Sequence, residues 1–232
     1  MNDIKKELQS LKNPTQAKIL QRFFKTGQGE YGEGDIFLGI KVPIQRQIVK
    51  KYFGISLKEV QELLKSEIHE YRLTALFILV KKYELSKNEI SREKIFKVYI
   101  KNKKHINNWD LVDLSAPNIV GNYLLDKDRK ILYNFAKSDY LWTRRIAMLS
   151  CYTFIKNGES KDALKIAEIL LYDKHDLIQK AVGWMLRELG KRVSQDIEEE
   201  FLKKYYKKMP RTALRYSIER FSDKKKRFYM SK

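Results

Sequence analysis

The stretch YLWTRRIAMLSCYTFIKN, residues 140–157, carries apolar residues three and four positions apart, the spacing that lines one face of an α-helix. The same pattern occurs in HEYRLTALFILVKKY, residues 69–83, and in HDLIQKAVGWMLRELGK, residues 175–191. The three stretches share a register of 35 residues. Steps of 35 from Thr74 reach Trp109, Arg144, Gln179 and Leu214. The register predicts one helix per period, each followed by a second helix.

Two columns of this register are mostly apolar, as expected for the buried positions of a repeat. One column contains Phe77, Val112, Ala147, Val182 and Ser217, and the other contains Leu79, Leu114, Leu149, Trp184 and Glu219. Helix pairs of this period stack into an α-solenoid with a concave face. We therefore predict an all-α solenoid of helical repeats, with a chance alignment of amphipathic helices as the alternative.

Shorter segments support a helical chain with one long loop. EVQELL at 59–64 and KDALKIAEILLY at 161–172 are typical of amphipathic helices. The stretch KTGQGEYGEGDIFLGIKVP at 25–43 predicts a loop, because Gly27, Gly29, Gly32 and Gly34 break any helix. We expect a single domain over 1–232. It would consist of N-terminal helices and the Gly-rich loop (1–43), repeats (about 44–221) and a basic tail (222–232).

The chain is strongly basic, with 48 Lys plus Arg against 29 Asp plus Glu and a formal net charge of +19. No single tail accounts for most of this excess, so a folded chain would carry it over its surface. Such a surface favours a polyanionic partner, with nucleic acid as the first candidate and an anionic membrane surface as the second.

The compartment follows from cysteine usage and from hydropathy. Cys151 is the only cysteine, which excludes an internal disulfide and a thiolate zinc site and fits a reducing cytoplasm. The N-terminal MNDIKKELQSLKN is amphipathic, and no apolar run has the length of a signal peptide or membrane span. We expect a soluble intracellular protein that does not enter membranes.

One column of the register repeats a positive charge. It reads Ala75, Asp110, Arg145, Lys180 and Arg215, so three successive repeats place a cation at equivalent positions. Equivalent positions of a solenoid line one groove, and a basic groove can follow a phosphate backbone. The alternative is a charged face that contacts only solvent.

Several kinds of catalytic site are excluded because their sequence motifs are absent. His69, His105 and His175 lack the spacing of metal ligands, and no HExxH motif is present. Cys151 lies in the apolar run MLSCYTFI, which predicts a buried packing residue. There is no phosphate-binding loop of the GxxxxGK[ST] type, and the glycines of 27–34 lack the strand–helix context of a dinucleotide site.

The tryptophans are the remaining candidates. A tryptophan on an amphipathic helix is most often part of the core. Trp109, however, has Asp113 four residues later, so an aromatic ring and a carboxylate share one helical face. A carboxylate repels a phosphate backbone, and stabilising a positive charge in a substrate is a more fitting role for it.

Four motifs over nearly the whole chain carry a resemblance to a known family. They are FLGIKVPIQR (37–46), WDLVD (109–113), LWTRRIAML (141–149) and IQKAVGWMLRELGK (178–191). The sequence resembles the DNA alkylation repair family of HEAT-like-repeat DNA glycosylases. The resemblance implies an α-solenoid whose concave basic groove cradles duplex DNA. It also implies hydrolysis of the N-glycosidic bond of N3- and N7-alkylated purines without a metal or cofactor.

The resemblance assigns roles to particular residues. The aspartate of the WDxVD pattern is the catalytic carboxylate of the family, which falls on Asp113. Trp109 in the same pattern and Trp184 in the QKAxGW pattern would line the lesion site. Cations that we expect to contact DNA are Arg145, Arg144, Lys180, Arg187, Arg215 and Arg46.

The chemistry of these residue types agrees with the implied activity. An alkylated purine is cationic and therefore a good leaving group, and its departure leaves an oxocarbenium-like sugar. An anionic Asp113 would stabilise that sugar and orient the attacking water. Two indole faces would offer cation–π contacts to the lesion.

The chain departs from the family pattern in its N-terminal helices. Members often present a tyrosine near the lesion, whereas QRFFKT here places Phe23 or Phe24 there, with the loss of a hydroxyl. The basic tail from Asp223 either adds DNA contacts or frays. Rival functions are a non-catalytic module that binds branched DNA or RNA, and a protein-binding scaffold. We expect a cytoplasmic monomer, associated with the nucleoid in a prokaryote.

Overall fold

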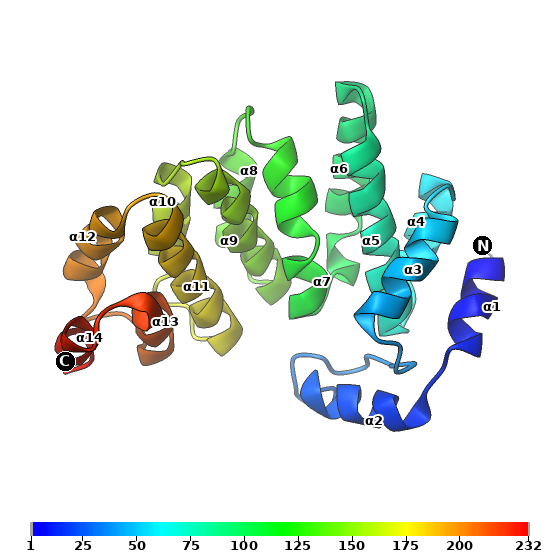
Figure 1. Ribbon diagram of the computed structural model, residues 1–232, viewed down its shortest axis with the longest axis horizontal. Coiled ribbons are helices and arrows are strands. Elements are labelled where there is room, and N and C mark those ends of the chain that lie inside the picture. Colours follow the sequence, from blue (N-terminus) through cyan, green and yellow to red (C-terminus); the bar gives the residue numbers. More distant parts are fainter. Residues whose placement is uncertain (1, 232) are drawn as a thin grey trace. The chain divides into compact units, whose positions relative to one another are not determined.

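The computed structural model describes residues 2–231, and this range is all-helical (Figure 1). It contains fourteen α-helices, two short 3-10 segments and one π-helical segment, and no β-strand beyond an isolated bridge between Ile36 and Ile68. The elements in chain order are α1 (Asn2–Ser10), α2 (Pro14–Phe23), α3 (Val42–Tyr52), α4 (Leu57–Leu64), α5 (His69–Leu85), α6 (Glu89–Lys101), η1 (Lys103–His105), α7 (Trp109–Asp113), η2 (Pro117–Gly121), α8 (Lys130–Ala136), α9 (Leu141–Lys156), α10 (Lys161–Ile169), α11 (Asp176–Arg192), α12 (Gln195–Tyr205), α13 (Arg211–Ser217), η3 (Ile218–Arg220) and α14 (Asp223–Met230).

The chain groups into two compact units, Met1–Ser115 and Ala116–Lys232. The first unit ends shortly after α7, and the second begins just before η2. The expectation of a single domain over 1–232, with a concave basic groove along it, stays a prediction.

The helical repeat predicted from the 35-residue register is confirmed. Thr74 and the four positions reached from it by steps of 35 lie on α5, α7, α9, α11 and α13, and a second helical segment follows each of these helices. Every member of one apolar column is buried, namely Phe77, Val112, Ala147, Val182 and Ser217. The period therefore describes repeated packing, and the chance alignment is excluded.

Polar caps explain where several helices begin. The side-chain oxygen of Asn13 accepts a hydrogen bond from the backbone N–H of Gln16, and Ser56 and Glu59 form a reciprocal capping box at the start of α4. Similar caps precede α6, α7, α12 and α14, at Asn88, Asn108, Ser194 and Ser222. Such caps satisfy first-turn N–H groups that have no partner within the helix.

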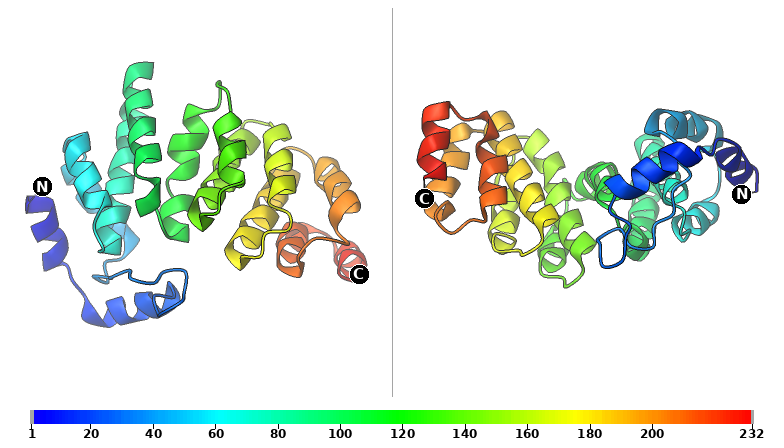
Figure 2. Two further views of the ribbon diagram at one scale, coloured as in Figure 1. Left: turned by 180° about the vertical axis from the view of Figure 1, so that it is seen from behind. Right: turned by 90° about the horizontal axis from the view of Figure 1, so that it is seen from below.

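In the second unit, α9 is the central helix. It packs against α8, α10, α11 and η2, and α11 in turn packs against α12 and α13 (Figures 1 and 2). The close approach of η2 requires Gly121, because a Cβ atom there would lie 2.5 Å from the Ser150 carbonyl oxygen. Thr153 Oγ1 secures the same contact by donating to the Pro117 carbonyl at 2.7 Å.

The basic tail is ordered as α14, so the frayed alternative is wrong. Ser222 caps this helix by accepting from the backbone N–H of Lys225. Tyr229 is 1% exposed and packs edge-on against the ring of Tyr206, while the Lys225 ammonium pairs with Glu199 at 2.7 Å. A DNA contact from this helix stays a prediction.

In the first unit, α5 is the central helix. It packs against α3, α4, α6 and α7, and its residues from His69 to Leu79 are buried without interruption. Three of these buried residues, His69, Glu70 and Arg72, have acidic or basic side chains. Burying such groups is unfavourable unless they are paired. The segments that supply their partners are therefore the segments that α5 holds in place.

Glu70 holds the end of the Gly-rich loop. Its carboxylate accepts three backbone N–H groups, from Leu38 at 2.9 Å, Gly39 at 2.8 Å and Ile40 at 3.2 Å. Gly39 is required there, because its φ is +86° and a Cβ atom would lie 2.2 Å from the Asn13 carbonyl oxygen. The predicted loop is confirmed, although α3 already begins at Val42 within the stretch.

His69 and Arg72 hold the middle of the loop through Asp35. His69 Nδ1 lies 3.0 Å from Asp35 Oδ2, and an Arg72 guanidinium nitrogen donates to Asp35 Oδ1 at 2.5 Å. The other ring nitrogen, Nε2, lies 2.9 Å from Asp110 Oδ2 on α7. Asn108 Nδ2 also donates to Asp35, at 3.2 Å. The loop, α5 and α7 are thus joined by one buried network.

The network favours a protonated His69. Burial opposes the charge, but Asp110 and Asp35 outweigh this effect and raise the pKa of His69 from 6.5 to about 9. Burial likewise opposes ionisation of Asp35, yet hydrogen bonding from His69 and the charge of Arg72 lower its pKa. At neutral pH His69 is therefore positively charged and Asp35 is negatively charged.

Replacing Glu70 with Gln should detach the loop end. The amide NH₂ group would face a backbone N–H donor, and a charged acceptor would be lost, so we expect a loss of about 2 kcal/mol in the free energy of unfolding. Urea titration measures this. Glu84→Gln, at an exposed position on the same helix, is the matched control and should change stability by less than about 0.5 kcal/mol. Equal losses in both variants would contradict the role of Glu70.

Stability should fall as His69 loses its proton. Its folded-state pKa is raised, so the stabilisation is complete below pH 6.5 and disappears as pH rises to about 9. The free energy of unfolding should decline over this range by on the order of 3 kcal/mol more in the wild type than in His69→Gln. Denaturant titrations at several pH values test this. His105→Gln should retain the wild-type decline, because burial lowers the pKa of His105.

Candidate functional site

The WDLVD motif forms α7, the helix expected around Trp109 and Asp113. Asn108 Oδ1 accepts from the backbone N–H of Trp109 at 2.8 Å, and Asp110 Oδ1 accepts from that of Leu111 at 2.8 Å. A helix of five residues has little stability of its own, because the hydrogen bonds of one turn do not offset the conformational entropy lost in nucleation. These caps and the packing on α5 therefore decide how α7 lies.

The pattern of exposure along α7 separates two residues from the rest. Trp109 and Asp113 are partly exposed, whereas Asp110, Leu111 and Val112 between them are buried. A spacing of four residues places two side chains on neighbouring positions of one helical face. The motif thus combines an anchoring face with a face that carries an indole and a carboxylate.

Trp109 belongs to an aromatic cluster of the first unit. Its ring stacks on Phe24, with centroids 5.1 Å apart and planes 18° apart, and meets the edge of Phe23 at 5.9 Å. Phe24 is buried, whereas Phe23 is 62% exposed. Phe23 and Phe24, the two candidates for the position of the family tyrosine, therefore both contact Trp109, and Phe23 is the more accessible of the two.

Asp113 ends α7 next to a buried hydroxyl pair. Ser115 Oγ donates to the Leu111 carbonyl oxygen, and the Tyr99 hydroxyl lies 3.0 Å from Ser115 Oγ. Burial raises the pKa of Tyr99, and the charge of Asp113 raises it further. Asp113 is therefore close enough to Tyr99 for their charges to interact.

The other two tryptophans lie in the second unit. Trp184 on α11 is partly exposed, and its ring lies 6.3 Å from that of Tyr152. Arg192 fixes Tyr152 by donating to its hydroxyl at 2.9 Å. Trp142 is 3% exposed and serves as core. Of the two tryptophans in this unit, only Trp184 has a ring available to a ligand.

The three cations of the repeated column lie in different environments. Arg145 is 5% exposed, and one of its guanidinium nitrogens donates to the Leu177 carbonyl at 2.5 Å, which ties α9 to α11. Lys180 is half-buried and pairs with Asp176 at 2.8 Å. Arg215 is exposed on α13. The equal spacing in sequence therefore does not give equal access to solvent.

Arg144 and Arg187 form hydrogen bonds and ion pairs within the second unit. Arg144 Nε donates to Asp173 at 2.6 Å, and another guanidinium nitrogen donates to two backbone carbonyls. Arg187 pairs with Glu219 on η3. A phosphate would have to compete with these carboxylates for either guanidinium group.

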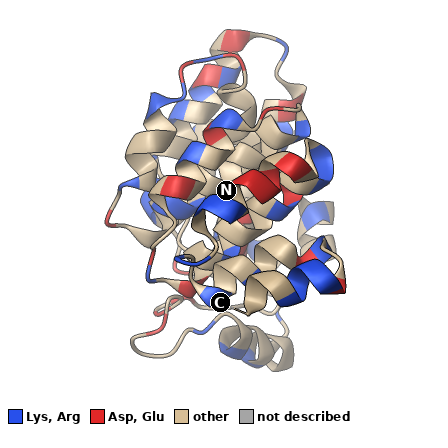
Figure 3. Ribbon diagram, turned by 90° about the vertical axis from the view of Figure 1, so that its left-hand side faces the viewer, with Lys and Arg blue, Asp and Glu red and all other residues tan. Residues whose placement is uncertain are grey.

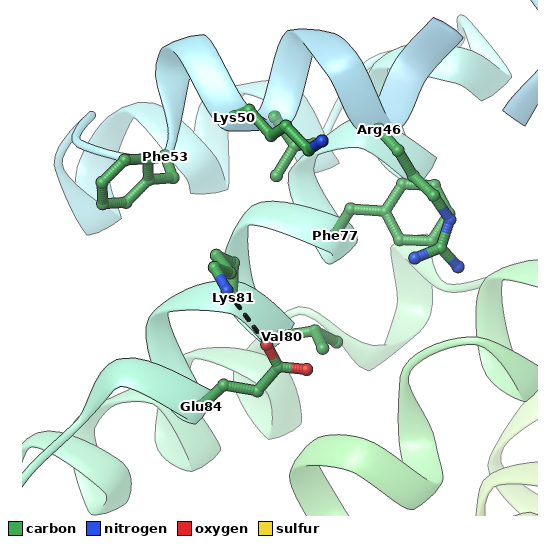
Figure 4. A pocket seen from close by; sticks show the side chains of 8 residues that line it. Arg46, Lys50, Phe53, Phe77, Val80, Lys81 and Glu84 are labelled. Carbon is green, nitrogen blue, oxygen red and sulfur yellow. Dashed lines mark ion pairs between the residues drawn. The ribbon is translucent and has the colours of Figure 1, made fainter. Parts of the chain in front are cut away.

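Arg46 lies in the first unit, at a groove of about 350 Å³ between α3 and α5 (Figure 4). Its guanidinium carbon lies 4.4 Å from the centre of the Phe77 ring, a cation–π contact. Lys50 and Lys81 border the same groove, and Phe53 lies at its other end. Arg46 therefore belongs to a cationic rim rather than standing alone.

The charge excess is distributed along the chain. Lys and Arg occur on many helices, interspersed with Asp and Glu (Figure 3). Among residues 2–231, no group of three His, Cys, Asp or Glu side chains is arranged to hold a metal ion. Within the same range no helix combines the length and apolarity needed to cross a membrane. Cys151 is fully buried, as expected for a packing residue, and burial raises the pKa of its thiol.

Sequence analysis missed the residues that hold α7. His69 contacts both Asp35 and Asp110, although 34 residues separate it from Asp35 and 41 separate it from Asp110. The register even placed Asp110 in the column of cations, without a role. The sequence did contain a signal for these contacts. His69 and Glu70 (the HE pair) begin a helix with a long apolar run, and charged side chains that become buried need partners.

Comparisons with known proteins agree with this fold. Among solved structures, a predicted DNA alkylation repair enzyme from Enterococcus faecalis superimposes with a TM-score of 0.70 at 18% sequence identity, covering 91% of this chain and 97% of that chain. A comparison with curated proteins gave no match. The sequence model of a family described as DNA alkylation repair enzyme matches residues 4–221. This match covers nearly the whole chain, and the chain therefore belongs to the DNA alkylation repair enzyme family.

Proposed function

We propose that the protein is a monofunctional DNA glycosylase that hydrolyses the N-glycosidic bond of cationic N3- and N7-alkylpurines in duplex DNA. The observation that carries the proposal is the partly exposed pair of Trp109 and Asp113 on α7. The charge of +19 and membership of a family that repairs alkylated DNA support the same substrate.

Asp113 is the catalytic carboxylate of the proposed reaction. The bond between C1′ and the purine nitrogen breaks with its electron pair moving to the base, which neutralises the alkylated ring. The sugar then carries the positive charge, and an anionic carboxylate stabilises it more than it stabilises the uncharged ground-state sugar. Asp113 also orients the water that adds to C1′ and accepts its proton.

Trp109 and, in the second unit, Trp184 each offer an indole face that favours a charged base. An indole face attracts a cation, which amounts to about 1 kcal/mol for a partly exposed contact. A neutral purine gains only the stacking part of this interaction. The stack on Phe24 fixes the plane of Trp109, so its orientation does not have to be ordered on binding.

DNA binding is assigned to cations with solvent access. Arg215 and Arg46 are exposed, and Lys180 can exchange Asp176 for a phosphate. Arg144 and Arg187 can do the same with their carboxylate partners. The guanidinium group of Arg145 is buried and joins α9 to α11. We propose that Arg145 contributes to DNA binding by holding these two helices in place.

The reaction needs no metal or cofactor, because the alkylated base is already an activated leaving group. We propose that the protein works as a monomer on duplex DNA in the cytoplasm, as part of base excision repair. The main rival is a non-catalytic module that binds branched DNA or RNA, and it differs in having no turnover to lose.

The decisive variant is Asp113→Asn. It removes the charge and keeps the shape, so single-turnover release of 7-methylguanine from an alkylated duplex should fall by at least about 100-fold. The dissociation constant for undamaged duplex should not increase. Asp126→Asn removes one exposed charge elsewhere and is the matched control for the change in net charge. Wild-type release no faster than spontaneous depurination, with tight binding of duplex or branched DNA, would establish the rival.

A phosphate contact by Arg215 should appear in the salt dependence of binding. Arg215→Gln should weaken binding of undamaged duplex and reduce the slope of log affinity against log salt by about 0.9. Fluorescence anisotropy at four or more salt concentrations measures the slope. Arg92→Gln removes an exposed cation from α6, on the other helix of a repeat, and should leave the slope unchanged. An equal effect of both variants would mean that only net charge matters.

A further inference from the structure

We propose that His69 is a positioning residue for the catalytic helix, and that it makes the placement of Trp109 and Asp113 depend on docking of the Gly-rich loop through Asp35. The proposal rests on the glycosylase function proposed above. It goes beyond that function because it assigns a role to a residue that contacts neither the lesion nor the DNA backbone.

His69 connects α5 directly to the first turn of α7. Its Nε2 lies 2.9 Å from Asp110 Oδ2, and the other oxygen of Asp110 accepts from the backbone N–H of Leu111. His69 is 1% exposed, and its imidazole stacks on the ring of Phe37 at 4.4 Å and contacts the ring of Phe24 at 5.1 Å. It cannot turn without leaving this stack, so the position of Asp110 is fixed.

A second connection runs from the loop to the same turn. Asp35 accepts from Asn108 Nδ2 at 3.2 Å, and Asn108 Oδ1 accepts from the backbone N–H of Trp109 at 2.8 Å. Gly32 allows the loop to approach, because a Cβ atom there would lie 2.4 Å from the Phe24 carbonyl oxygen and 3.4 Å from Asn108 Nδ2. Asp35 thus reaches α7 both through His69 and through Asn108.

The hydrogen bonds of His69 require a protonated ring. Both ring nitrogens face oxygens of carboxylates, which only accept hydrogen bonds when ionised, so both nitrogens must donate. A neutral ring would turn a lone pair toward one carboxylate. The charged groups facing the ring are Asp35, Asp110 and Arg72. Loss of the proton would weaken one of the two connections to α7.

This arrangement matters because α7 is only five residues long. Displacement of its first turn moves Trp109 directly and moves Asp113 one turn later. A shift of about 1 Å in a catalytic group can lower a rate by about 100-fold. His69 is therefore expected to affect the reaction only through the position of α7, and to leave the affinity for DNA unchanged.

The test compares His69→Gln, Asp113→Asn and the double variant in single-turnover release of 7-methylguanine at saturating protein. His69→Gln should be slower than the wild type by about tenfold to 100-fold. Its dissociation constant for undamaged duplex should stay within about twofold of the wild-type value. If His69 acts through the position of α7, the double variant should be slowed by clearly less than the product of the two single effects.

Two further measurements separate positioning from general loss of stability. Leu63→Ala removes a buried side chain of α4 in the same unit and is the matched control, which should be less stable yet catalyse at the wild-type rate. Amide hydrogen exchange over residues 109–114 should accelerate in His69→Gln and remain slow in Leu63→Ala. The wild-type rate should also decline as pH approaches about 9, and this decline should be absent in His69→Gln. Should His69→Gln fail to fold, Asp35→Asn tests the same connection.

The outcomes are distinguishable. An inactive wild type would refute the proposed glycosylase function, and hydrogen exchange would then decide the positioning role by itself. An active wild type with an equally fast His69→Gln variant would overturn the positioning role and leave the glycosylase intact. A double variant slowed by the product of the two single effects would also overturn it, because His69 would then act on the fold as a whole.

Discussion

The hydrogen bonds of His69 to Asp35 and Asp110 are the interactions on which the first unit depends most. An ionisable ring with almost no exposed surface is tolerable only because two carboxylates compensate its charge, and Arg72 balances the second carboxylate. Through these bonds one residue of α5 holds both a long glycine-rich loop and a five-residue helix. Neither of those segments has enough internal hydrogen bonding or apolar surface to keep its conformation alone.

The same constraint explains why α7 can serve as a site. A side chain that is buried in the core cannot also contact a substrate. A catalytic helix therefore needs some residues that anchor it in the core and others that are exposed. In α7 the anchoring is done by Asp110, Leu111 and Val112, which leaves Trp109 and Asp113 partly exposed. The anchoring is polar at one end and apolar in the middle. Polar anchoring is directional, which suits the catalytic role that we propose for Asp113, because that role needs an accurately placed carboxylate.

Buried arginine has a comparable supporting role in the second unit. Arg145 joins α9 to the backbone at Leu177 at the start of α11, the helix that bears Trp184. Its expected contact with DNA stays a prediction. Exposed cations such as Arg215 are the ones that we propose to contact phosphates. This division between supporting and contacting arginines follows from desolvation. A guanidinium group that is buried needs several acceptors from the protein itself and has none left for a ligand.

The sequence by itself determined the helical class, the 35-residue repeat, the buried apolar column and the helix formed by WDLVD, because these depend on local periodicity. It also pointed to Trp109 and Asp113, since two residues four apart share a helical face in any fold. Only the tertiary structure decided that Arg145 is buried and that the HE pair on α5 grips the loop and α7. Those outcomes depend on which segments meet in space. His69, Asp35 and Asp110 are more than 30 residues apart, and neither spacing nor composition records which distant charges will neutralise one another.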